Sequence, residues 1–232
     1  MQKKFKGILI YAKIFKENDL YIKFLSNTDE LISGIVYGGL SKKKRNIYQV
    51  GYYLNFEVSF KLNKPSSITA ELSEPYIADI IDDKYKINCV LCVTSLVNLS
   101  IIEGQKIKDI YVETDKFLSF MFLNKQWLRS FFIYLFNLLK IIGYEINLEN
   151  KNNKLFFDID SLEFTNSRTN KSIHFHEIFL ENNNLKIEKK TIIKFFNIFE
   201  YIFNKYHLSN FNLILPNQYY LFKKLIMNRV NK

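Results

Sequence analysis

The chain has 232 residues, of which 48% are hydrophobic and 24% are charged, so it can bury one large core or two small ones. Two cysteines exclude a disulfide framework, and no run of about 18 apolar residues predicts a membrane-spanning helix. The formal net charge of +10 is compatible with nucleic acid, an anionic membrane surface or acidic protein tails as partners.

The positive charge is concentrated at the two ends of the chain. Residues 1–80 carry 12 Lys and Arg against 8 Asp and Glu, residues 81–150 carry 8 of each, and residues 151–232 carry 13 against 7. A genome rich in A and T also raises the lysine content, so the position of the charge is more informative than its total. The basic N-terminus alternates polar and apolar residues, unlike a signal peptide, which predicts a cytoplasmic protein.

The first 80 residues predict a small β-barrel. Five short segments are rich in β-branched and aromatic residues and partly alternate between polar and apolar positions: 4–14, 20–26, 31–38, 53–62 and 67–77. Closing these strands into a barrel removes exposed sheet edges, so we expect a five-stranded OB fold as the first domain.

From residue 81 to residue 232 the pattern becomes helical, which predicts an α+β chain with a helical second domain. The expected helices are 84–102, 111–123, 127–143, 190–206 and 217–230, the third of them ending at Gly143. A polar insert at about 150–177 interrupts them. Within it, 162–165 and 171–175 flank a turn, which predicts a small β-hairpin.

Metal and catalytic motifs are weak in this sequence. Cys89 and Cys92 have the spacing of half a zinc site, but no second pair exists and both lie in an apolar helix, which favours core packing. His174, His176 and Glu177 could hold a metal, although a polar strand face is the commoner explanation. No nucleophile motif or phosphate-binding glycine loop is present, so we expect a binding protein that is not an enzyme and has no metal or cofactor.

The stretch GLSKKKRN, residues 39–46, joins the third and fourth expected strands. Lysines attract phosphates regardless of base sequence, and exposed aromatic rings can stack on bases. The candidate phosphate contacts are Lys42, Lys43, Lys44, Arg45, Lys16, Lys23, Lys61 and Lys64. The candidate stacking rings are Tyr21 and Tyr37. Alternatively, both tyrosines pack against the helical part and the lysines reflect coding bias.

The chain resembles the bacterial RecO family of DNA repair proteins, in the form without zinc-binding cysteines. The resemblance covers nearly the whole chain, in order, and rests on Gly7-Ile8-Leu9-Ile10, Leu25-Ser26, Gly34-Ile35-Val36-Tyr37-Gly38-Gly39-Leu40-Ser41 with Arg45, Gln49 to Gly51, Glu103, 138–148 and 161–175. The chain departs from the family pattern at Glu30, at Tyr37 and at Asn166 with Asn170. It also departs at Ile133 and Leu135, where relatives carry charged residues.

The resemblance implies a recombination mediator that binds single- and double-stranded DNA and anneals complementary strands. It also implies an association with the nucleoid during repair and partners named RecR, RecF and SSB, the single-strand binding protein, with assistance to RecA loading. For the acidic tail of SSB, an apolar groove of the helical domain with Arg129 and Lys125 at its rim is the expected site.

Two other functions remain open from the sequence. One is a protein-interaction scaffold whose barrel does not bind DNA directly. The other is a metal-dependent nuclease that uses His174, His176 and Glu177.

Overall fold

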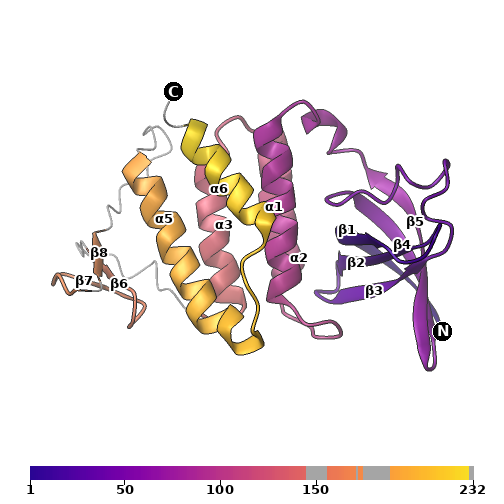
Figure 1. The fold of residues 1–232 in the computed structure, drawn as a ribbon, viewed down its shortest axis with the longest axis horizontal. Coiled ribbons are helices and arrows are strands. Elements are labelled where there is room, and N and C mark those ends of the chain that lie inside the picture. The colour runs from indigo at the N-terminus through magenta and orange to yellow at the C-terminus, as the bar shows by residue number, and fades with distance from the viewer. Residues whose placement is uncertain (145–155, 171, 175–188, 230–232) are drawn as a thin grey trace. The chain divides into compact units, whose positions relative to one another are not determined.

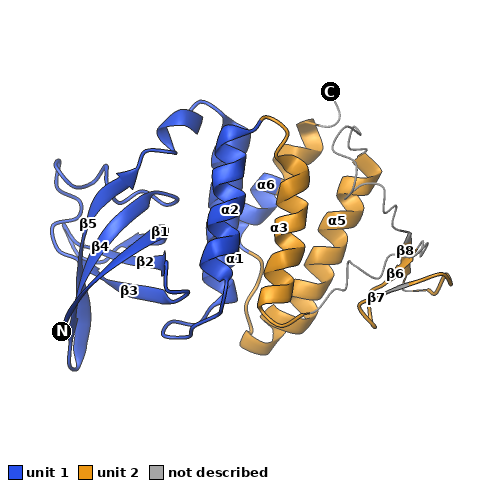
Figure 2. Cartoon of the chain, turned by 180° about the vertical axis from the view of Figure 1, so that it is seen from behind, with its two compact units in different colours: residues 1–124, 216–222 blue, residues 125–215, 223–232 orange. Residues whose placement is uncertain are grey.

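The structure is a computed structural model, and it describes residues 1–144, 156–170, 172–174 and 189–229 (Figure 1). The chain divides into two compact units (Figure 2). The first comprises residues 1–124 with 216–222, and the second comprises residues 125–215 with 223–232. The predicted domain boundary near residue 80 stays a prediction.

A closed five-stranded barrel begins the first unit, as the sequence predicted. Its strands are β1 (Gln2–Ile14), β2 (Leu20–Ser26), β3 (Leu31–Val36), β4 (Tyr53–Lys61) and β5 (Lys64–Glu74). Their order around the barrel is β1-β2-β3-β5-β4, with β3 and β5 parallel and the other pairs antiparallel. This arrangement confirms the OB-like barrel.

Alternating apolar residues fill the barrel because successive side chains of a strand point to opposite faces. Ile22 and Phe24 of β2 are buried in the barrel core. Phe56 and Val58 of β4 are buried in the same core. The rings of Phe24 and Phe56 stack with centroids 3.7 Å apart and planes 7° from parallel. Ile8 and Ile10 of β1 are also buried, and α1 contacts this strand.

Two helices follow the barrel within the first unit, after a short 3₁₀ turn (Ala78–Ile80). Helix α1 (Lys84–Ser100) begins at Asp83, whose carboxylate accepts hydrogen bonds from the backbone of the first turn. Helix α2 (Ile110–Leu123) is capped from the β2–β3 turn, because the Asp29 carboxylate accepts from the Tyr111 backbone N–H at 3.0 Å. No helix in the described ranges is long and apolar enough to cross a membrane.

The second unit is mainly helical. Its elements include α3 (Leu128–Ile141), α5 (Lys189–Ile202), a π-helical turn (Phe203–His207), a 3₁₀ turn (Leu208–Phe211) and the later part of α6 (Asn217–Arg229). Stacked and tilted phenylalanine rings join α3 to α5, among them Phe132 and Phe195 with centroids 4.8 Å apart. Helix α3 ends just before Gly143, whose φ of +99° suits glycine, as predicted.

The insert contains three short strands: β6 (Phe156–Asp158), β7 (Glu163–Thr165) and β8 (Ser172–His174). A small hairpin is present, formed by β6 and β7. The expected pairing of 162–165 with 171–175 is wrong, because β6 lies between β7 and β8 and pairs with both. The sequence pattern predicted strands at the positions of β7 and β8 but not β6, which supplies the partner of both.

Candidate nucleic-acid interface

The predicted basic residues Lys42 to Arg45, here called the basic segment, lie in a series of tight turns between β3 and β4. The backbone N–H groups of Lys44 and Arg45 both donate to the Ser41 carbonyl at 3.0 Å. No carboxylate in the described parts of the chain forms an ion pair with any of the four side chains. Lys42, Lys43 and Arg45 are exposed and Lys44 is half-buried, so the charge of the basic segment lies at the protein surface.

Apolar residues hold the basic segment at both of its ends. Leu40 before it and Ile47 after it pack against the barrel core, and Tyr48 is buried within that core. The Tyr48 hydroxyl also accepts a hydrogen bond from the Ala70 backbone N–H at 3.1 Å. The basic segment is thus a short excursion between two fixed points, which keeps its charged side chains at the surface.

Two hydrogen bonds hold the β1–β2 loop at the same end of the barrel. The Leu40 N–H donates to the Asn18 carbonyl at 3.1 Å, and the Gly38 N–H donates to the Asp19 carboxylate at 2.8 Å. Residues 15–19 and 37–47 together form what we call the loop end of the barrel. It contains six of the ten predicted contacts: Lys16, Tyr37, Lys42, Lys43, Lys44 and Arg45.

Tyr21 and Lys23 lie on the outer face of β2, as the alternation predicted, but Glu103 occupies part of this face. The Ser33 hydroxyl donates to the Glu103 carboxylate, and the Tyr21 hydroxyl donates to it at 3.5 Å. Partial burial raises the pKa of Tyr21, and the negative charge of Glu103 acts in the same direction. The face that OB folds commonly use for oligonucleotides therefore carries a carboxylate of the chain itself.

Replacing Glu103 with glutamine (Glu103→Gln) tests whether the outer face of β2 and β3 contributes to binding. We expect about a threefold higher affinity for single-stranded DNA, because one negative charge near the phosphates is removed. Fluorescence anisotropy with a labelled oligonucleotide measures this, with Glu74→Gln at the end of β5 as the control. A fall in affinity for Glu103→Gln would contradict the expectation.

Lys61 and Lys64 lie apart from the loop end. They are cross-strand partners at the tip of the β4–β5 hairpin, and Lys64 begins β5, whereas the sequence placed it in a loop. The hairpin tip adjoins the start of β1, since the Phe60 N–H donates to the Met1 carbonyl at 2.9 Å. The loop end adjoins the last residues of β1, so the two basic clusters lie at opposite ends of this strand.

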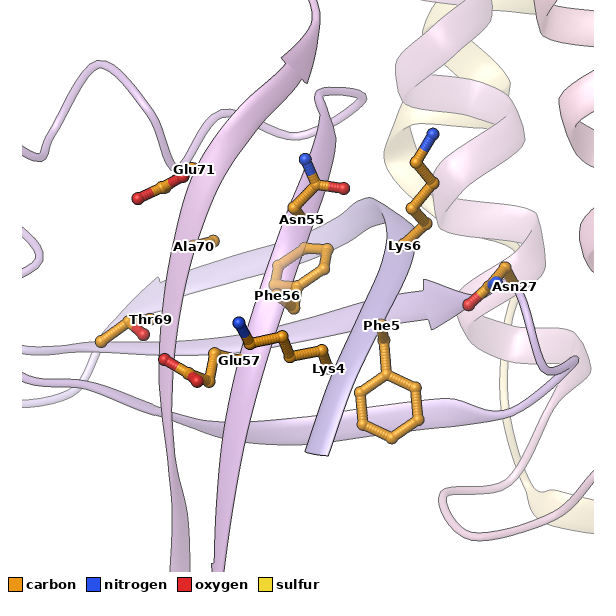
Figure 3. A pocket seen from close by; sticks show the side chains of 10 residues that line it. All are labelled: Lys4, Phe5, Lys6, Asn27, Asn55, Phe56, Glu57, Thr69, Ala70 and Glu71. Carbon is orange, nitrogen blue, oxygen red and sulfur yellow. The ribbon is translucent and has the colours of Figure 1, made fainter. Parts of the chain in front are cut away.

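A depression of about 450 Å³ lies over the outer face of β1, β4 and β5 (Figure 3). Lys4 and Glu57 are cross-strand partners on its floor, and Lys6 lies in the same row as Asn55 and Glu71. Two lysines and two glutamates balance each other, so this surface offers no excess of positive charge. We do not assign it to DNA.

The two residues of the helical domain that are predicted to contact the SSB tail differ in exposure. Lys125 is exposed just before α3, whereas Arg129 in the first turn of α3 is only 8% exposed. A guanidinium this deeply buried has little surface to offer to an acidic tail. Lys125 is therefore the better placed of the two.

The candidate metal ligands are only partly described. Cys89 and Cys92 are fully buried in α1, as packing residues are, and this burial raises the pKa of both thiols. His176 and Glu177 lie outside the described residues. Among the residues that are described, no group of three or more His, Cys, Asp or Glu side chains is placed to hold a metal ion.

Sequence reasoning missed two features of this interface. Glu103 was noted only as part of a family resemblance, because no local spacing links it to Tyr21, 82 positions away. Phe15 at the loop end was also missed, although an aromatic residue next to Lys16 in a predicted loop was a usable signal.

Comparison with known proteins finds two distant relatives. The chain is 25% identical over 152 residues to the DNA repair protein RecO of Roseobacter denitrificans, covering 64% of the chain and 62% of that protein. It is 27% identical over 143 residues to the DNA repair protein RecO of Rickettsia canadensis, covering 61% and 58%. The chain thus spans about three fifths of the length of these curated relatives. No protein-family model matches it.

Proposed function

We propose that this chain is a non-enzymatic DNA-binding mediator of DNA repair. The observation that carries the proposal is the basic segment, whose four cationic side chains are held at the barrel surface without an intramolecular ion pair among the described residues. Support comes from the OB-like strand order and from the similarity to two proteins named DNA repair protein RecO.

In this proposal the basic segment and Lys16 contact phosphates, with Lys23, Lys61 and Lys64 as supporting charge. Phosphate contacts release counterions and do not depend on base sequence, so single and double strands both bind. Neutralising two strands on one basic surface lowers their mutual repulsion, which promotes annealing of complementary strands. By its resemblance, the chain would act on SSB-coated DNA together with RecR and assist RecA loading.

Strand annealing tests this function directly. Complementary oligonucleotides carrying a fluorophore and a quencher are mixed with and without the protein, first naked and then coated with SSB. We expect the protein to accelerate annealing in both cases. Annealing no faster than without the protein would contradict the proposal.

A second function, a scaffold that binds proteins and not DNA, is favoured by two observations. Glu103 occupies the outer face of β2 and β3, and the depression beside β1 is balanced in charge, which suits a protein partner better than a phosphate backbone. If the chain is such a scaffold, its affinity for single-stranded DNA should be no higher than that of an unrelated basic protein.

A further inference from the structure

Two aromatic rings stand exposed at the loop end. Phe15 is 48% exposed and Tyr37 is 54% exposed. A cross-strand row runs over three neighbouring strands, from Ile14 of β1 through Leu20 of β2 to Val36 of β3. Phe15 directly follows Ile14 in the chain, and Tyr37 directly follows Val36. Strands lie about 4.8 Å apart, so these two backbone positions are roughly 10 Å from each other.

Backbone hydrogen bonds hold the segment that carries Phe15 in place. The Phe15 N–H donates to the Asp19 carbonyl at 2.9 Å, which closes the β1–β2 loop on itself. The contacts of Asn18 and Asp19 with residues 38–40 then fix this loop to the segment that carries Tyr37. An exposed ring on a fixed loop loses little further freedom on binding, which favours its use as a contact.

One cation lies near the Phe15 ring, and another contacts the Tyr37 backbone. The Lys16 ammonium is 5.6 Å from the centroid of the Phe15 ring, and the Lys44 ammonium donates to the Tyr37 carbonyl at 3.3 Å. Of the two carboxylates in this loop, Asp19 already accepts from the Gly38 N–H, and Glu17 is exposed. Aromatic rings alternating with cations are the arrangement with which proteins bind single-stranded nucleic acid.

We propose that Phe15, with Tyr37 at the same end of the barrel, is a base-stacking platform that makes the loop end prefer single-stranded DNA over duplex. This inference rests on the proposed DNA binding. It assigns the preference for single strands over duplex to a residue outside the basic segment. Bases in a duplex are stacked on each other and offer only phosphates to this surface. A single strand offers its phosphates and also its unpaired bases, so only its affinity depends on the ring.

Replacing Phe15 with alanine (Phe15→Ala) separates stacking from phosphate attraction. We expect the affinity for a single-stranded oligonucleotide to fall about 10-fold, within the range measured for the loss of one stacked base. Duplex affinity should stay within about twofold of wild type, since the lysines remain. Phe120→Ala, which removes a ring that is 41% exposed on α2, is the matched control and should change neither affinity.

Replacing Phe15 with tryptophan (Phe15→Trp) gives a second readout. It should retain the affinity for single strands, and its fluorescence should be quenched on binding of a single strand but not of a duplex. Wild type supplies the background, because its one tryptophan, Trp127, is only 1% exposed.

The possible outcomes are distinguishable. If wild type binds DNA but Phe15→Ala loses no affinity for single strands, or loses affinity equally for both substrates, the stacking platform is wrong and the proposed function stands. If wild type binds neither substrate, the proposed function itself fails.

Discussion

Replacing Lys42, Lys43, Lys44 and Arg45 together with glutamine should lower the affinity for single-stranded DNA about 100-fold at 0.1 M salt. Each phosphate contact contributes about 0.7 to the slope of log affinity against log salt, which corresponds to roughly fivefold in affinity between 1 M and 0.1 M salt. Three such contacts give about this loss, and a fourth would raise it to about 600-fold. Duplex affinity should fall at least as far. For the single strand, the slope of log affinity against log salt should become shallower by about 2 to 3.

The matched control removes four exposed lysines from the chain's neutral middle. In this variant Lys106, Lys108, Lys116 and Lys140 are replaced by glutamine, which lowers the net charge by the same amount. Its affinity should stay within about threefold of wild type, because long-range attraction between exposed charges is screened at this ionic strength. Equal losses in the two variants would show that net charge, and not the basic segment, determines binding.

Replacing Phe24 with alanine should destabilise the barrel by about 3–5 kcal/mol. The ring is fully buried and stacks on Phe56 at 3.7 Å, so its removal leaves a cavity and also breaks an aromatic pair. Chemical denaturation followed by far-ultraviolet circular dichroism measures the change in the free energy of unfolding.

Phe60→Ala is the comparison for this core substitution. Phe60 lies in β4 near the hairpin tip and is partly exposed, so its loss should cost less than about 1 kcal/mol. A Phe24→Ala protein as stable as Phe60→Ala would mean that the core of the barrel differs from the one described here.

Much of the secondary structure of the first unit follows from local sequence pattern. The predicted segments 20–26 and 84–102 agree with β2 and α1 to within two residues, because alternation and helical periodicity are properties of neighbouring residues. The parallel pairing of β3 with β5 could not be predicted from local pattern, because it consists of a single bridge between Ile35 and Ser67. The place of β6 between β7 and β8 likewise depends on contacts that no local period specifies.

The candidate site was predictable in composition but not in geometry. Lysine runs and aromatic residues are visible in the sequence, and the loop end does collect six of the ten predicted side chains. Three facts depended on the fold: the hairpin tip lies at the far end of β1, Glu103 reaches Tyr21, and Arg129 is buried. Each of them involves burial or residues far apart in sequence.

A salt titration of the wild-type chain tests the central claim most directly. The affinity for a fluorescent single-stranded oligonucleotide is measured between 0.05 and 0.5 M salt, on the order of one decade of ionic strength. We expect saturable binding with log affinity falling linearly against log salt, at a slope of about −3 or steeper, as four or more phosphate contacts require. Absence of saturable binding at 0.1 M salt, or an affinity that does not respond to salt, would contradict the account.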